Sequence, residues 1–359
     1  MKYYSLKNIL AMKGLYNIII GERSNGKTFA CFRYALERYV KHGEQFALVR
    51  RWREDFIGKR GTVMFDALQA EGVISKLTKG VWTGVYYYSG KWYLSVADDV
   101  TGKNIIGDKP FCYGFSISSM EHDKSTSYPN IKTVIFDEFI SRQGYLPDEF
   151  ILFMNVLSTI IRQRDDVTIF MLGNTVSKMC PYFTEMGLTH ITKMEPGAID
   201  LYNYGNSGLT VAVEYVKSGS QGKKSDVYFA FDNPKLSMIT QGSWEMDIYP
   251  HCPVKYKPKD VLFRYYIDFM DTLLECEIIN VDEYYFTFVH RKTTPLKYPN
   301  DDLIYSTGFN VGGNYHRKII YPQTKIEKKV AEHYINDKVY YSDNEVGEIV
   351  MNYLKWCKK

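Results

Sequence analysis

The residues best suited to chemistry lie near the start of the chain, in the segment GERSNGKT at 21–28. A strand-forming run precedes this segment and a helical pattern follows it, which is the context of a phosphate-binding P-loop. Its backbone N–H groups would surround phosphate oxygens, and the new helix N-terminus adds partial positive charge. The residues that would bind the nucleotide are Gly21, Glu22, Arg23, Ser24, Asn25, Gly26, Lys27 and Thr28.

Two side chains of this segment have specific parts in P-loop chemistry. Lys27 would reach the β- and γ-phosphates, and the hydroxyl of Thr28 would ligate Mg²⁺. The plainer alternative is a glycine-rich turn with a solvated lysine. The strand–loop–helix context favours the first interpretation, so the sequence predicts binding of ATP with Mg²⁺.

A pair of acids follows a second apolar run, at 133–136. Asp137 at the end of such a strand can hold Mg²⁺, usually through water. Glu138 can polarise a water molecule for attack on the γ-phosphate. The alternative is a pair of exposed acids in a turn. The adjacency of the two acids favours hydrolysis by ring-forming and RecA-like P-loop proteins over small-molecule kinases.

A polar residue ends the next predicted strand, at 167–172. The segment Gly173-Asn174-Thr175 places an amide there, and Asn174 could sense the γ-phosphate and align the attacking water. Alternatively, these residues form only the turn that ends the strand. Ligands bind at the carboxyl ends of strands in open α/β sheets, so we expect the P-loop, the acid pair and Asn174 at one edge.

Arginines close the helix predicted at 148–164. They could simply complement the helix dipole. They could also stabilise transition-state charge on the ATP of a neighbouring subunit, with Arg164 the first candidate and Arg162 the second. Arg23, inside the P-loop, could contact the γ-phosphate or remain a solvated loop side chain.

The elements that must position these residues alternate between strand and helix over residues 1–205, which predicts a mostly parallel sheet flanked by helices. A helix should end at His42-Gly43, residues 54–80 look helical, and 81–96 look like a hairpin that turns at Ser89-Gly90. Further strands are expected at 45–51 and 111–117. This part of the chain is the predicted ATPase domain.

The sequence changes character after this domain. Gly and Ser concentrate in residues 206–243 around two short strand-like pieces, which predicts a connecting module. Residues 244–359 carry three aromatic, β-rich runs within 261–294 and a terminal helix at 344–356. They predict a smaller α+β domain built on a meander.

Composition narrows the class of protein without deciding its partner. The 359 residues hold six widely spaced cysteines, which are typical of reduced, buried thiols in an intracellular protein. No apolar run reaches the length of a membrane span. The formal net charge of +4 fits an ordinary solvated surface as well as a nucleic-acid partner.

Four segments resemble, in order and spacing, the DNA-packaging ATPases of small tailed bacteriophages of the phi-29 type: GERSNGKT, QFALVRRW, VIFDEF and FMLGNT. More distantly they resemble terminase large subunits. The resemblance covers roughly residues 10–200. It implies an ATPase of the additional-strand, catalytic-Glu class, joined by a linker domain to a C-terminal domain of RNase H-like fold.

The resemblance also implies a function and partners. Proteins of this family form a homomeric ring, typically of five subunits, that docks on the portal vertex of an empty procapsid in the host cytoplasm. The ring drives double-stranded DNA inward with ATP. Phosphate contacts carry little sequence information, as a motor that passes any sequence requires. In the best-known member the docking partner is a structural RNA.

The resemblance implies roles for individual residues of this chain. Lys27 and Thr28 match the P-loop, Asp137 the metal site, Glu138 the catalytic base and Asn174 the sensor. The trans-acting arginine falls in the stretch that holds Arg162 and Arg164. Basic residues on pore-facing loops grip DNA in this family, and the candidates here are Lys59, Arg60 and Lys124.

The C-terminal domain decides between two versions of this function. Asp268 lies where an RNase H-like fold would place its first acid, but Asp271, Asp282 and Glu283 give no convincing set of metal ligands. We therefore expect a degenerate domain that docks rather than cleaves. Its basic residues His290, Arg291 and Lys292 could serve that docking.

Two alternatives remain open at the level of sequence. One is a complete terminase, with an active metal-dependent nuclease in the C-terminal domain. The other is a P-loop ATPase or scaffold that is not coupled to DNA. The Asp137-Glu138 pair together with Asn174 argues against the second alternative, since a mere binding switch does not need all of them.

Overall fold

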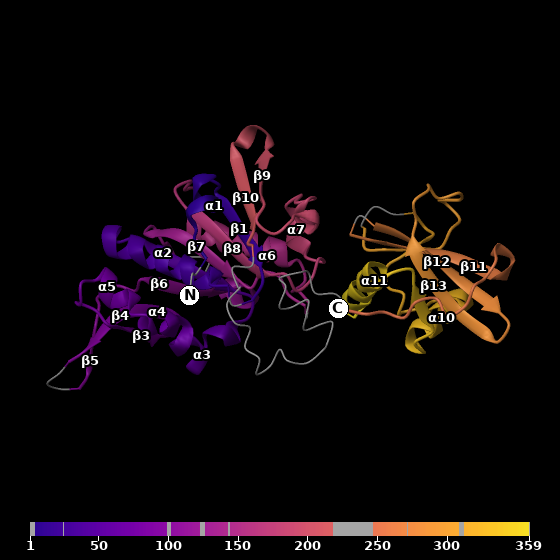
Figure 1. The fold of residues 1–359 in the computed structure, drawn as a ribbon. Helices are drawn as coiled ribbons and strands as arrows, with labels where there is room; N and C mark the ends of the chain where they lie inside the picture. Colours follow the sequence, from indigo (N-terminus) through magenta and orange to yellow (C-terminus); the bar gives the residue numbers. More distant parts are fainter. Residues whose placement is uncertain are drawn as a thin grey trace. The chain divides into compact units, whose positions relative to one another are not determined.

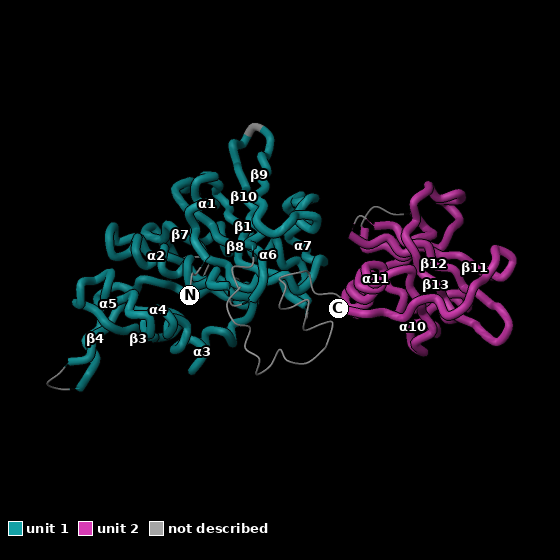
Figure 2. Tube along the Cα trace, viewed as in Figure 1, with its two compact units in different colours: residues 1–245 teal, residues 246–359 magenta. Residues whose placement is uncertain are grey.

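The computed structural model describes residues 4–23, 25–98, 102–122, 126–142, 144–217, 247–270, 272–308 and 312–358. The chain forms two compact units, residues 1–245 and 246–359 (Figure 2). Among the described residues, none of the helices is both long and apolar enough to cross a membrane. All six cysteines are free thiols, and five of them are buried.

The first unit is built on one ten-stranded sheet (Figure 1). Its strand order is β3-β4-β6-β2-β7-β8-β1-β10-β9, and β5 pairs with β4. The six strands from β6 to β10 in this order are parallel to one another. The strands are β1 Tyr16–Gly21, β2 Gln45–Arg50, β3 Gly84–Tyr88, β4 Lys91–Ala97, β5 Asn104–Ile106, β6 Cys112–Ser116, β7 Ile131–Asp137, β8 Thr168–Asn174, β9 Ile199–Tyr204 and β10 Leu209–Tyr215.

Helices cover this sheet on two sides because its central strands are buried at almost every position, so both faces need cover. Ile18 and Ile20 of β1 belong to the core that includes Phe153 of α6, whereas Ile19 belongs to the core that includes Phe32 of α2. The helices are α1 Lys7–Ala11, α2 Lys27–His42, α3 Lys59–Thr62, α4 Asp66–Ala70, α5 Val73–Leu77, α6 Glu149–Ile161 and α7 Pro181–Glu185.

Most elements expected in this unit are present, and the exceptions have local causes. The helical region expected at 54–80 is broken into short helices, because Gly58 and Gly72 adopt positive φ angles of 59° and 65°. The hairpin that turns at Ser89-Gly90 forms as predicted. Helix α6 ends at Ile161, so Arg162 and Arg164 follow the helix rather than close it.

The boundary predicted after residue 205 differs from the observed one. It falls inside the β9–β10 hairpin, and β10 pairs with β1 in the first sheet. The Gly- and Ser-rich sequence around 205–208 marks the turn of this hairpin rather than the end of a domain. Most of the connecting module predicted at 206–243 lies outside the described residues.

The second unit has a six-stranded sheet of order β15-β14-β11-β12-β13-β16. Strands β11, β12 and β13 form the predicted meander, and β14 and β15 add in parallel beyond β11. The terminal helix forms as predicted. The elements are β11 Val261–Phe269, β12 Thr272–Val281, β13 Tyr284–Arg291, β14 Ile304–Ser306, β15 Tyr315–His316, α10 Lys325–Ile335, β16 Val339–Tyr341 and α11 Asn344–Cys357.

Candidate nucleotide-binding site

The segment predicted to be a P-loop connects β1 to α2 and encloses its own lysine. Gly26 begins the helix at a φ of 87°, a conformation that favours glycine. The Lys27 ammonium donates to the carbonyl oxygens of Glu22 at 2.6 Å and Gly21 at 3.3 Å, and to the amide oxygen of Asn174 at 3.2 Å. Lys27 is only 5% exposed. Burial lowers its pKa to about 8, although Asp137 and Glu22 act in the opposite direction.

Thr28 and Asp137 meet beside this lysine. The Thr28 hydroxyl donates to Oδ1 of Asp137 at 3.2 Å, and the same oxygen accepts from the Glu138 N–H at 3.1 Å. Burial raises the pKa of Asp137, and the guanidinium of Arg50 offsets part of that rise. A hydroxyl and a carboxylate held this close are hard oxygen ligands, so they fit Mg²⁺.

The end of β2 supplies a residue that was not singled out from the sequence. Arg50 Nη1 lies 2.9 Å from Oε2 of Glu138 and 3.6 Å from Oδ2 of Asp137. The side chain of Arg50 is 15% exposed, whereas that of Glu138 is 63% exposed. The sequence did carry a signal. Strand β2 ends at Arg50, with Arg51 next, and it pairs in parallel with β7, which ends at Asp137, with Glu138 next.

These residues surround one pocket of about 730 Å³ at the carboxyl ends of the strands. The predicted P-loop, acid pair and Asn174 all contribute to it, as does Arg23. The lining residues are Arg23, Asn25, Gly26, Lys27, Thr28, Phe29, Arg50, Arg51, Trp52, Asp55, Asp137, Glu138, Ile140, Ser141, Arg142, Leu172, Gly173, Asn174 and Val176. Ser24, also predicted for this site, lies outside the described residues.

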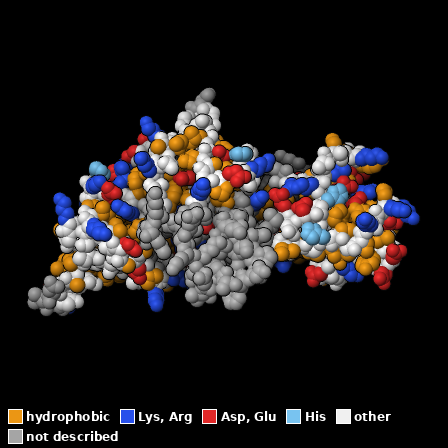
Figure 3. Space-filling model, viewed as in Figure 1, with side chains coloured by type: hydrophobic (Ala, Val, Ile, Leu, Met, Phe, Trp, Pro, Cys, Tyr) orange, Lys and Arg blue, Asp and Glu red, His pale blue; other side chains and the backbone are white. Residues whose placement is uncertain are grey.

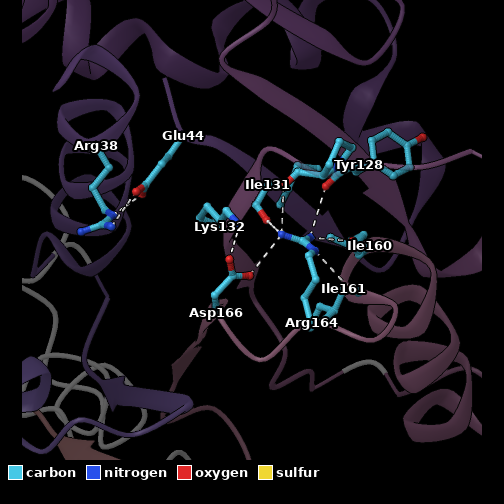
Figure 4. Close-up of polar contacts among 10 residues, drawn as sticks. Arg38, Glu44, Tyr128, Ile131, Lys132, Ile160, Ile161, Arg164 and Asp166 are labelled. Atoms are coloured by element: carbon cyan, nitrogen blue, oxygen red, sulfur yellow. Dashed lines mark hydrogen bonds and ion pairs between the residues drawn. The ribbon is translucent and has the colours of Figure 1, made fainter. Parts of the chain in front are cut away.

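The two arginines after α6 have different surroundings, and neither lines this pocket. The guanidinium of Arg164 donates to the carbonyls of Tyr128, Pro129, Ile131, Ile160 and Ile161 (Figure 4). It therefore joins the end of α6 to the segment before β7. Arg162 is exposed and donates to one carbonyl, that of Thr126, at 3.1 Å.

The DNA-binding candidates are exposed where they are described. Lys59 and Arg60 begin α3, and Arg60 lies 3.8 Å from Asp55. Lys124 lies outside the described residues. Basic and acidic side chains are interspersed on the face seen in Figure 3. Charge on this face therefore does not single out a DNA contact.

The carboxylates considered for a nuclease site do not converge. Asp268 on β11 accepts from the Ser306 hydroxyl of β14 at 2.9 Å. Asp282 and Glu283 form the turn between β12 and β13. Asp268 pairs with the opposite end of β12, so about 30 Å of strand separates it from this turn. Asp271 lies outside the described residues.

A different group of metal-type ligands was missed because its members are brought together only by strand pairing. Glu275, Glu277 and His290 lie on β12 and β13 with ligand atoms within 4.8 Å of one another. Arg264 and Lys292 also pair with these carboxylates, at 2.8 Å from Glu277 and 2.9 Å from Glu275. The cluster is thus neutralised by the protein's own cations.

The same contacts occupy the residues considered for docking. His290 lies 3.8 Å from Glu277, and Lys292 pairs with Glu275. Arg291 lies 3.2 Å from Glu345 of α11. Each of the three basic residues therefore has a carboxylate partner within its own unit.

Sequence comparison identifies relatives of the N-terminal half of the chain. The DNA packaging protein of Bacillus phage phi29 is 30% identical over 184 residues, which are 50% of this chain and 49% of the relative. That of Bacillus phage B103 is 31% identical over 183 residues, 50% of each protein. The chain spans about half the length of each of these relatives.

Structural comparison extends over both units. The structure of the bacteriophage phi-29 viral genome packaging motor assembly matches with a TM-score of 0.57, at 18% identity, over 98% of each chain. The phi-28 gp11 DNA packaging motor matches with a TM-score of 0.52, at 18% identity, over 99% of this chain and 98% of that one. At these identities the likeness establishes the fold alone.

A family model gives the remaining comparison. The model of the podovirus DNA encapsidation protein (Gp16) matches residues 1–195. That range is more than half of the chain and contains every residue that lines the pocket described above. The chain belongs to the podovirus DNA encapsidation protein (Gp16) family.

Proposed function

We propose that this protein hydrolyses ATP with Mg²⁺ and uses the energy to move double-stranded DNA into an empty procapsid. The observation that carries the proposal is the meeting of Lys27, Thr28, Asp137, Glu138 and Asn174 in one pocket, although they come from three separate parts of the sequence. Membership of a DNA encapsidation family supports the DNA substrate.

The strand order supports the additional-strand, catalytic-Glu class of P-loop proteins. Strand β8 lies between the P-loop strand β1 and the acid-bearing strand β7. Its last residue, Asn174, therefore lies between the lysine and the acids and bonds to the lysine. This placement suits a residue that senses the γ-phosphate.

Five residues of the pocket would have defined parts in hydrolysis. Thr28 and Asp137 would hold Mg²⁺, which offsets phosphate charge when bound. Lys27 would bind the terminal phosphates, and Glu138 would accept a proton from the attacking water. Arg50 holds the carboxylate of Glu138 beside that of Asp137, so it orients the base toward the metal side of the pocket.

We infer that the protein forms a homomeric ring, for which the family resemblance implies five subunits. The ring would dock at the portal of the procapsid in the host cytoplasm, with or without a structural RNA. For the trans-acting arginine the contacts favour Arg162 over Arg164. Moving the Arg164 side chain would break hydrogen bonds to five backbone carbonyls, whereas moving Arg162 would break one. DNA contacts by Lys59, Arg60 and Lys124 remain part of the proposal.

The strand order of the second unit supports an RNase H-like domain. Its first three strands form an antiparallel meander, and the fourth and fifth add in parallel beside the first. Ser306 lies opposite Asp268, where a second acid would be needed to share a metal ion. We therefore propose a domain that does not cleave, and a nuclease assay with Mg²⁺ or Mn²⁺ tests this point.

The low pKa of Lys27 predicts that ATP binding takes up a proton above pH 8. Free Lys27 loses its charge as the pH rises through about 8. Bound phosphates stabilise the charged form of Lys27, so the complex holds more protons than the free protein. The affinity for ATP therefore falls by up to about tenfold for each unit that the pH rises above 8. Calorimetry in two buffers of different ionisation enthalpy measures this uptake. Equal heats in both buffers at pH 8.5 would contradict it.

The proposed function is tested by steady-state Mg-ATP hydrolysis with and without linear double-stranded DNA. We expect turnover that rises when DNA is added, with Glu138→Gln as the blank. Turnover that DNA and procapsids leave unchanged would favour an ATPase not coupled to DNA. Absence of turnover in all conditions would contradict the proposal.

A further inference from the structure

Two adjacent arginines at the end of β2 contact the same dipeptide in different ways. Arg50 contacts the carboxylate of Glu138. Arg51 contacts the backbone: Nη1 donates to the Glu138 carbonyl at 3.3 Å and Nη2 to the Phe139 carbonyl at 2.8 Å. The side chain and the backbone of the proposed base are thus held by separate residues.

Arg51 is itself fixed in the core by a buried carboxylate. Its Nε and Nη2 donate to the two oxygens of Glu149 at 2.7 and 2.8 Å. Arg51 is 6% exposed and Glu149 2% exposed. Glu149 also accepts from the Tyr182 hydroxyl at 3.0 Å and the Leu146 N–H at 2.8 Å. A buried pair with this many hydrogen bonds keeps the guanidinium in one place.

The backbone that Arg51 holds is in an uncommon conformation. Glu138 has a φ of 60°, which a residue with a side chain adopts only when its surroundings impose it. The N–H of Glu138 donates to Asp137, and the N–H of Phe139 donates to the Leu172 carbonyl at 3.2 Å. Arg51 supplies the matching contacts to the two carbonyls, so the dipeptide is held on all its polar groups.

We propose that Arg51, held by Glu149, is a positioning residue that fixes the backbone of Glu138 for hydrolysis. The inference rests on the proposed ATPase function. Lysine cannot replace it, because a single ammonium cannot bind Glu149 through two parallel bonds and also reach two carbonyls. Misplacing a catalytic group by about 1 Å can lower a rate by roughly 10²-fold.

The first test compares Arg51→Lys with Arg38→Lys. Arg38 makes a similar two-bond pair, with Glu44 at 2.5 and 2.8 Å (Figure 4), and neither of these residues lines the pocket. We expect Arg51→Lys to lower kcat by roughly 10- to 100-fold with KM within about twofold of the wild type. Arg38→Lys should leave both parameters unchanged. A KM that rises as much as kcat falls would overturn the inference.

A double mutant separates positioning from general damage. If Arg51 acts through Glu138, Arg51→Lys should cause no further loss of single-turnover hydrolysis in a Glu138→Gln background. The same fold-loss in both backgrounds would overturn the inference. Tyr182→Phe is a milder variant for the case in which Arg51→Lys does not fold, because it removes only the hydroxyl that donates to Glu149. We expect kcat of this variant to fall several-fold.

Hydrogen exchange tests the inference without relying on turnover. Peptides that cover residues 137–140 should exchange faster in Arg51→Lys than in the wild type, while those that cover α2 should not change. Unchanged exchange at 137–140 would overturn the positioning role. Absence of hydrolysis by the wild type would instead contradict the proposed function, so the two failures are distinguishable.

Discussion

Glu138→Gln is expected to bind ATP normally and to hydrolyse it about 10³-fold more slowly, because the amide cannot accept a proton from water. The substitution keeps the size of the side chain, and the 63% exposure of that side chain makes a change in stability small. Arg50 would lose its charged partner at 2.9 Å but would keep Asp137 at 3.6 Å. Binding of a fluorescent ATP analogue and single-turnover hydrolysis measure the two effects separately.

A matched control is Glu185→Gln, which makes the same chemical change at an exposed position of α7. It should leave binding and turnover at wild-type levels. Near-normal turnover of Glu138→Gln would remove Glu138 as the base. A loss of ATP binding equal to the loss of turnover would instead assign Glu138 to the binding of the nucleotide.

Lys27→Ala has the second largest expected effect, a loss of ATP affinity of roughly 10- to 100-fold. Charge-assisted hydrogen bonds to phosphate are worth about 1.5–3 kcal/mol, and alanine removes all of them. The variant should still fold, since removing a buried ammonium also removes the cost of its desolvation. Equilibrium binding with Mg-ATP and thermal unfolding of the same samples measure affinity and stability.

Lys41→Ala is the control for this variant. Lys41 lies on the same helix, is exposed and pairs with Glu37 one turn away. It should not change ATP affinity. Wild-type affinity in Lys27→Ala would remove the P-loop from the proposed mechanism, and a collapse of stability in Lys27→Ala alone would assign Lys27 a structural role.

The positions of the segment at 21–28, of the acid pair and of the strands that carry them were predictable from sequence because their signals are local. The run at 134–136 is apolar at every position, and the acid pair follows it directly. The geometry confirms that Lys27, Thr28, Asp137 and Asn174 lie together. Their parts in catalysis remain proposals.

The contacts made by the arginines were not predictable, because they depend on which strands become neighbours. Arginine side chains are mostly exposed, yet pairing of β2 with β7 places Arg50 on carboxylates and Arg51 on backbone carbonyls. Strand pairing likewise assembles Glu275, Glu277 and His290. The position of β10 was missed because the turn before it has the composition of a linker.

Strand β8, which lies between β1 and β7, limits how the sequence of this protein can change in evolution. Two strand spacings, about 9.5 Å, separate β1 from β7. This distance does not depend on the length or the fold of the chain that connects the two strands. Thr28 and Asp137 are 109 positions apart, and much of that interval forms α3–α5 and the β3–β4 hairpin at one end of the sheet. Insertions or deletions there can reshape the outer part of the unit while the distance between the segment at 21–28 and the acid pair stays constant.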